Sequence, residues 1–182
     1  MRRLLPLAVL VLPFALTFCD NSDDNNNIIA IGPVVNGNVT IYDDCDSVSF
    51  NAAIAPGTCT KAGTTTLSAF NAELTANQSV AAWRFAPTAL TVTLGGTIAA
   101  FNTGGENHTF TEVANFGGGI VPALNTAAGT PVEAPECAAL ASNALIAPGA
   151  TFTTDQADAV GVEHYQCCIH PWMRANVTIV AR

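Results

Sequence analysis

A short stretch near the C-terminus constrains the fold most strongly, because it holds three metal-binding side chains at a fixed spacing. Cys167, His170 and Met173 follow one another at intervals of three residues. A thiolate, an imidazole and a thioether are the donors that a mononuclear copper needs when it changes between two oxidation states. A trigonal site of this kind needs a second imidazole, and His108 supplies one from far upstream. The fold must therefore bring two distant segments together.

The size and composition of the chain indicate one mostly β domain. At 182 residues, of which 49% are hydrophobic, the chain can bury a core of ordinary size. Much of the hydrophobic content is Ala, Val and Ile beside many Thr and Gly, a mixture that favours strands and turns over long helices. The net charge of −8 argues against binding to nucleic acid and favours basic protein partners.

The first residues are predicted to be an export signal. Two arginines precede an apolar run over residues 4–16, which is too short to span a bilayer, so residues 1–18 are assigned as a signal peptide. The run ends in Leu-Thr-Phe-Cys, similar to the lipobox of bacterial lipoproteins, in which the cysteine carries the lipid. Phe18 is larger than the residue usually found there, so lipidation of Cys19 and ordinary cleavage nearby remain alternatives.

We therefore expect an exported protein, periplasmic or at the cell surface, whose only link to a membrane would be a lipid at Cys19. The polar and acidic residues 19–27 are predicted to form a solvated tether, and residues 28–182 the folded domain. Loss of the signal removes two arginines, which leaves four Lys and Arg (6 − 2) against 14 Asp and Glu, a net charge of 4 − 14 = −10.

Four further cysteines are predicted to form two disulfides. If Cys19 carries lipid and Cys167 carries metal, the remaining cysteines can pair in three ways in an oxidising compartment. We favour Cys45 with Cys59 and Cys137 with Cys168. Two alternatives stay open: Cys168 as a free buried thiol, and Cys167 in a disulfide with Cys137. Cys168 fits poorly as the metal ligand, because neighbouring side chains on a strand point to opposite faces.

Short alternating strands separated by Gly and Pro turns predict a β-sandwich. Leu90, Val92 and Leu94 alternate with threonines, and further strands are expected over 28–42, 82–87, 97–101, 151–154, 160–168 and 176–182, in antiparallel sheets packed on each other. Thr66 is predicted to cap a short helix. Residues 114–149 are predicted to form a long loop that Cys137 staples, with a turn at the three glycines 117–119.

Three motifs over residues 79–182 resemble the cupredoxins, the blue copper proteins that include plastocyanin, azurin and amicyanin. They are Trp83-Arg84-Phe85-Ala86-Pro87 with the alternating strand that follows, Asn107-His108-Thr109-Phe110, and Tyr-Gln-Cys-Cys-Ile-His-Pro-Trp-Met-Arg at 165–174. The spacing in the last motif is similar to the short ligand loop of amicyanin.

The resemblance implies an all-β, Greek-key β-sandwich that binds one type 1 copper ion. His108, Cys167 and His170 would be the equatorial ligands and Met173 the axial ligand, with the backbone amide of Thr109 donating to the Cys167 sulfur. The implied function is electron transfer between redox partners, basic proteins such as cytochromes included, by a monomer that is not an enzyme. Electrons would pass through a partly exposed edge of His170.

Two other functions are weighed against electron transfer. A module for periplasmic copper storage, delivery or sensing could use the same ligands, but such proteins often carry Met- or His-rich tracts, which this sequence lacks. A multicopper enzyme needs more than the three histidines present. His164 is expected on the opposite strand face from Cys167, and Glu106 and Asp158 are expected at solvated loop positions without a catalytic role.

Overall fold

Two four-stranded sheets form the core of the structure, a computed structural model that describes residues 32–141 and 143–182. The predicted signal peptide, the tether with Cys19, and the first residues of the predicted domain lie outside the described residues. The first sheet has the order β2-β1-β4-β6, with β1 Gly37–Tyr42, β2 Arg84–Ala86, β4 Ile98–Asn102 and β6 Thr151–Thr153. The second has the order β3-β8-β7-β5, with β3 Ala89–Thr93, β5 Thr111–Val113, β7 Gly161–Gln166 and β8 Arg174–Val180.

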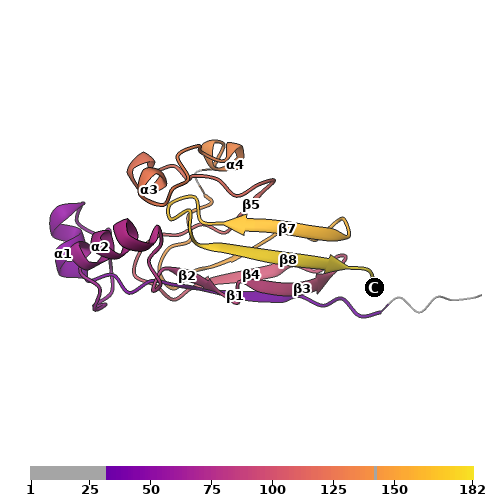
Figure 1. Cartoon of the computed structure of the whole chain (residues 1–182). Helices are drawn as coiled ribbons and strands as arrows, with labels where there is room; N and C mark the ends of the chain where they lie inside the picture. Colours follow the sequence, from indigo (N-terminus) through magenta and orange to yellow (C-terminus); the bar gives the residue numbers. More distant parts are fainter. Residues whose placement is uncertain (1–31, 142) are drawn as a thin grey trace, which may run out of the picture. The chain divides into compact units, whose positions relative to one another are not determined.

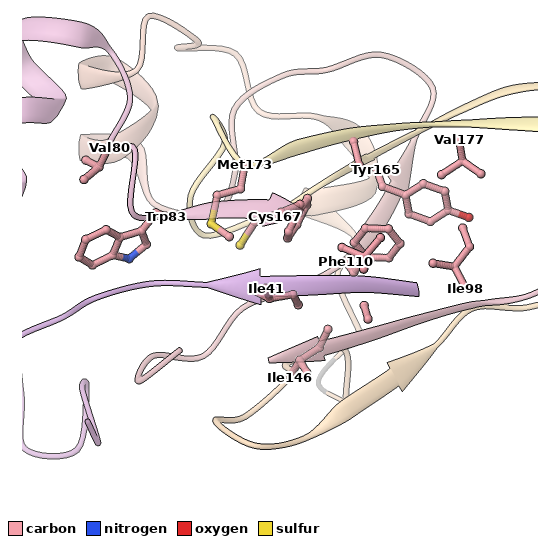
Figure 2. Close-up of a cluster of buried hydrophobic side chains, with 14 of the residues drawn as sticks. Ile41, Val80, Trp83, Ile98, Phe110, Ile146, Tyr165, Cys167, Met173 and Val177 are labelled. Carbon is pink, nitrogen blue, oxygen red and sulfur yellow. The ribbon is translucent and has the colours of Figure 1, made fainter. Parts of the chain in front are cut away.

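Alternation along the strands builds the core between the sheets. Val39 and Ile41 of β1 point inward, and in β8 the buried Ala175, Val177 and Ile179 alternate with exposed neighbours. Each fully buried Val or Ile contributes about 1.5–3 kcal/mol by leaving water. Figure 2 shows side chains of both sheets meeting in this layer. The predicted Greek-key β-sandwich is confirmed.

The strand pairing departs from the prediction in one respect, because the sheets are mixed. β1 pairs with β4 and β3 pairs with β8 in parallel, whereas the other pairs are antiparallel. Parallel neighbours need long crossover connections. The chain provides them by passing from one sheet to the other between the paired strands. The expectation of purely antiparallel sheets was wrong, because alternation within a strand does not report the direction of its partner.

Four short helices accompany the sheets in the described residues. They are α1 Ser47–Ala53, α2 Leu67–Asn77, α3 Pro122–Ala127 and α4 Pro135–Ala138. The predicted cap is present on α2, where the Thr66 side chain accepts a hydrogen bond from the Ala69 N–H and where Phe70 and Leu74 are buried. The other three helices were not predicted, because segments of four to seven residues are too short to show a periodicity. None of the helices in the described part has the length and apolar character of a bilayer span.

The helices gather around one end of the sheets. Figure 1 shows α1 and α2 beyond the end where β7 finishes and β8 begins, with α3 and α4 beside the connection between these strands. The C-terminus lies at the opposite end. Contacts from α2 to the β7–β8 connection agree with this view, since the Phe70 ring lies 5.8 Å from the Trp172 ring. The β7–β8 connection is therefore covered rather than open to solvent.

Both favoured disulfides are present. Cys45 pairs with Cys59, and Cys137 of α4 pairs with Cys168. Among the described cysteines, Cys167 is the free thiol, and it is buried. The two alternatives, a free Cys168 and a bond between Cys167 and Cys137, were therefore wrong.

The glycine triplet brings the long loop against the β7–β8 connection. Ile120 N–H donates to the Cys168 carbonyl over 2.7 Å, and a side-chain carbon at Gly119 would collide with that same carbonyl. Glycine is thus needed at position 119, because the loop passes close to the Cys168 carbonyl. The loop, the Cys137–Cys168 disulfide and this contact together hold the residue that follows Cys167.

We predict that removing the Cys137–Cys168 disulfide destabilises the domain without changing its fold. The bond closes a loop with a sequence separation of 31, so the Cys137→Ala/Cys168→Ala variant should lose about 2–4 kcal/mol of unfolding free energy. Urea denaturation followed by tryptophan fluorescence measures this loss. An unchanged unfolding midpoint would show that packing alone holds the loop.

Candidate metal centre

The β7–β8 connection places three of the predicted ligands together. Cys167 directly follows β7, and Met173 directly precedes β8. Cys167 N–H donates to the Met173 carbonyl over 3.0 Å, and Met173 N–H donates to the His170 carbonyl over 2.9 Å. These bonds close a tight turn. The exposed fractions are 0% for Cys167, 3% for His170 and 1% for Met173, so the turn directs all three side chains inward.

His108 reaches the same place from the connection between β4 and β5. Its backbone exchanges two hydrogen bonds with Ile146, of 3.2 and 2.7 Å, which fix the residue in an isolated bridge. The Cys167 Sγ lies 3.8 Å from Nδ1 of His108 and 3.8 Å from Nδ1 of His170. The potential ligand atoms of these three residues all lie within 4.8 Å of one another. The structure thus brings together His108, Cys167 and His170.

Thr109 contacts the Cys167 sulfur, and Met173 is buried at the end of the same turn. Figure 2 labels Met173 and Cys167 in the same buried layer, and both residues belong to the core cluster. Thr109 N–H donates to the Cys167 Sγ over 3.5 Å. The Thr109 hydroxyl accepts from the N–H of Cys168 over 2.8 Å. Residue 109 therefore touches the Cys167 sulfur and also fixes the backbone that follows it.

A buried carboxylate, Asp43, supports His108 and was not predicted. Its Oδ2 lies 2.8 Å from His108 Nε2, and neither side chain is exposed. The same carboxylate accepts backbone N–H bonds from Gly105, over 2.8 Å, and from Glu106, over 3.0 Å. A side-chain carbon at Gly104 would collide with it. In the sequence, the only sign that another group lies close to the backbone here was the Gly104-Gly105 pair before His108.

Glu106 supports the second histidine, contrary to expectation. We predicted a solvated position, but Glu106 is only 7% exposed. Its Oε2 accepts a hydrogen bond from Trp83 Nε1 over 2.6 Å and lies 3.6 Å from His170 Nε2. The prediction failed because helices α1 and α2 cover this end of the sandwich. Asp158 is exposed, as expected.

His164 lies away from the cluster, as predicted. Its Nδ1 is 2.7 Å from the side-chain oxygen of Asn176, and its ring packs 4.9 Å from that of Phe116.

The charges of the metal-free site depend on one another. Burial raises the pKa of the Asp43 carboxyl, but hydrogen bonds from His108 and two backbone amides outweigh it and lower the pKa to about 2. Burial lowers the pKa of His108, but Asp43 and Cys167 outweigh it and raise the pKa to about 9. Burial raises the pKa of the Cys167 thiol, yet the two histidines bring it well below its usual value. The cysteine is therefore held as a thiolate, the form that binds metal.

Burial also raises the pKa of Glu106, with His170 and Trp83 opposing the shift. In both histidines Nδ1 faces Cys167 and Nε2 faces a carboxylate. When a metal displaces the proton on Nδ1, the carboxylate at Nε2 favours keeping the remaining proton on Nε2, so that the Nδ1 lone pair can bind the metal.

The distances suit a single ion. A metal–sulfur bond is about 2.3 Å long and a metal–imidazole bond about 2.0 Å. Their sum exceeds the Sγ–Nδ1 distance of 3.8 Å between Cys167 and each histidine. One ion can therefore bridge Cys167 and either histidine, and the ligand atoms of all three residues lie within 4.8 Å of one another. Two nitrogens and one thiolate form a donor set that suits copper.

The expectation of an exposed His170 edge was wrong. The ring is surrounded by other rings, with centroids 5.5 Å away for Trp172 and 6.4 Å away for Phe70. It also lines a pocket of about 420 Å³. The other side chains of this pocket are mostly apolar and include Phe50, Ile54, Leu67, Val121, Leu124 and Ile169.

Comparisons with known proteins found similar solved structures, but no family model and no curated protein sequence matches the chain. Among solved structures, the chain is similar to a purple cupredoxin from Nitrosopumilus maritimus, with 15% identity and a TM-score of 0.45 over 80% of this chain and 100% of that one.

It is also similar to plastocyanin from Dryopteris crassirhizoma, with 15% identity and a TM-score of 0.42 over 79% of this chain and 100% of that one. A third similar structure is an amicyanin mutant with Cu(I), at 16% identity and a TM-score of 0.37 over 53% of this chain and 73% of that one. At these values, any function has to be argued from the site itself.

We predict that the Asp43–His108 pair stabilises the metal-free protein most at weakly acidic pH. The lowered pKa of Asp43 gives stability that is present above pH about 4 and lost as the pH falls towards 2. The raised pKa of His108 gives stability that is present below pH about 6.5 and lost as the pH rises through about 9. Asp43→Asn should therefore cost about 2 kcal/mol near pH 5.5 and less at pH 3 or pH 9.

Urea unfolding of the metal-free protein at these three pH values measures the effect. Asp158→Asn is the matched control, since it removes an exposed carboxylate. An Asp43→Asn deficit that is equal at all three pH values would show that Asp43 acts through shape and not through charge.

Proposed function

We propose that this chain is an exported mononuclear type 1 copper protein that carries electrons between redox partners. The observation that carries the proposal is the convergence of two imidazole Nδ1 atoms and a thiolate within 4.8 Å, in a buried and preformed site. Met173 is buried, and its carbonyl accepts the Cys167 N–H over 3.0 Å. This combination of soft and borderline donors is the one that type 1 copper uses.

The way the chain holds these donors suits electron transfer. His108 is fixed by its bridge to Ile146, and Cys167 is fixed by its bond to the Met173 carbonyl. Copper bound here would supply a one-electron exchange between two oxidation states. Because the donors belong to hydrogen-bonded backbone on two different segments, they would keep similar positions in both states. A small rearrangement of ligands is what fast electron transfer requires.

The aromatic rings around His170 offer a route to the surface. The ring of the partly exposed Trp172 lies 5.5 Å from that of His170. The apolar pocket of about 420 Å³ opens over the same histidine. We propose that a partner approaches on this side and exchanges electrons through His170 and Trp172, in place of the exposed edge expected from the sequence.

The burial of the site favours an electron carrier over a copper store or delivery protein. A delivery protein has to release its metal, which is easier from exposed ligands. Here His108 and Cys167 are 0% exposed and Met173 is 1% exposed. An enzymatic role is not proposed, because the sequence has three histidines, too few for a second copper centre.

The proposed location and partners follow from charge and cysteine use. Two disulfides suit an oxidising compartment such as the periplasm or the cell surface. A pocket of about 320 Å³ near Tyr165 is lined by four carboxylates, those of Glu112, Asp155, Asp158 and Glu163. The net charge of −8 would draw a basic redox protein, cytochrome-like proteins included, towards the molecule as a whole. We propose a monomer, with a lipid at Cys19 as its only link to a membrane.

We predict that the copper-loaded protein is blue and that Cys167 is the source of the colour. Reconstitution should give an intense thiolate-to-copper charge-transfer band and reversible one-electron voltammetry. Cys167→Ser should abolish the band, because no other thiol of the described residues is free. Cys168→Ser is the control and should keep the band, because Cys168 is bonded to Cys137.

A colourless and weakly held copper would overturn the proposal. Transfer of copper to a mild chelator within seconds would favour the delivery function instead. A band that survives in Cys167→Ser and vanishes in Cys168→Ser would reverse the ligand assignment.

A further inference from the structure

Both histidines of the candidate site rest on carboxylates that come from outside the β7–β8 connection. The Asp43 side chain is 0% exposed and the Glu106 side chain 9% exposed. Asp43 faces His108 Nε2 at 2.8 Å, and Glu106 faces His170 Nε2 at 3.6 Å. Two buried negative groups beside one metal site are costly to fold unless other groups compensate them.

Asp43 is held in place without the help of His108. Its carboxylate accepts N–H bonds from the backbone of Cys45, over 3.3 Å, and of Gly105 and Glu106, over 2.8 and 3.0 Å. The missing side chain at Gly104 leaves the space that the carboxylate fills. The backbone therefore fixes this acceptor, and the acceptor in turn fixes the orientation of the imidazole.

Glu106 is held by the aromatic layer under helices α1 and α2. Trp83, which is 1% exposed, donates its indole N–H to Glu106 Oε2 over 2.6 Å. The Trp83 ring stacks 5.8 Å from that of Phe50 and lies 4.7 Å edge-on to that of Phe70. Phe50 belongs to α1 and Phe70 to α2. The helical layer thus positions a carboxylate at the second histidine.

We propose that Asp43 and Glu106 are positioning residues that hold both Nδ1 atoms towards Cys167, and that their negative charges favour Cu(II) over Cu(I). The inference rests on the proposed copper function and adds to it. A fixed negative charge stabilises the more highly charged ion more strongly, and the effect is larger where water is excluded. Hydrogen-bond partners of metal-bound histidines commonly change metal affinity by about 10–100-fold.

Two isosteric variants of the full chain test the inference. Asp43→Asn and Glu106→Gln each remove one charge and keep the shape of the side chain. Glu133→Gln, at an exposed position, is the control because it changes the net charge equally. The midpoint potential is measured by voltammetry on the copper-loaded protein, and the affinities for Cu(II) and Cu(I) are measured by chelator competition.

Each site variant should lower the Cu(II) affinity relative to that for Cu(I) by about tenfold or more. A tenfold change raises the midpoint potential by about 59 mV for one electron. The double variant should shift further, and Glu133→Gln should match the wild type. Midpoint potentials of both site variants equal to that of the control would overturn the inference.

The outcomes separate this inference from the proposed function. A wild-type protein that forms no blue copper site would contradict the function itself. A blue wild type with unshifted site variants would contradict only the roles of Asp43 and Glu106. If Asp43→Asn does not fold, Glu106→Gln decides the question alone. The Glu106 side chain accepts from Trp83 and not from a set of backbone N–H groups, so its replacement disturbs the fold less.

Discussion

The structure depends on one buried charge, the thiolate of Cys167 between two imidazole nitrogens. A buried thiolate is costly unless opposite charges or hydrogen bonds surround it. The two Nδ1 atoms at 3.8 Å and the amide of Thr109 at 3.5 Å provide that surrounding. Because one histidine comes from the β4–β5 connection and the other from the β7–β8 connection, the site exists only when the two sheets are packed.

Each group that balances a buried charge is itself buried and needs a partner of its own. An imidazole that balances the thiolate is itself buried, and a carboxylate balances it in turn. The backbone amides of Gly105 and Glu106 satisfy the first carboxylate, and the indole of Trp83 satisfies the second. The segment between β1 and β2, with α1 and α2, therefore completes the site as well as the core. Its disulfide, Cys45–Cys59, lies two residues beyond Asp43 and ties down this segment.

The sequence was informative wherever the signal was local. The spacing of Cys167, His170 and Met173 predicted a turn that the structure contains, and alternation predicted the strands of the sandwich. The cap at Thr66 and both disulfides are also confirmed. The copper-ligand roles of Cys167, His170 and Met173 remain predictions, because they concern a bound ion.

What the sequence missed depends on contacts between distant segments. Asp43 and Glu106 gain their roles only through neighbours brought by the fold, and an acidic residue beside a glycine pair is usually solvated. The burial of His170 follows from helices too short to show a periodicity. The parallel pairs β1–β4 and β3–β8 depend on crossovers between the sheets, which no pattern within a single strand can report.

Burial of the proposed copper site would have two opposite consequences. Excluding water strengthens every electrostatic interaction around the metal and reduces the solvent that must reorganise when the charge changes. It also moves the metal away from any partner, which would slow electron transfer. The ring of Trp172 resolves this conflict, because it contacts His170 on one side and is partly exposed on the other. A buried site can therefore still be connected to the surface when the connection is an aromatic ring.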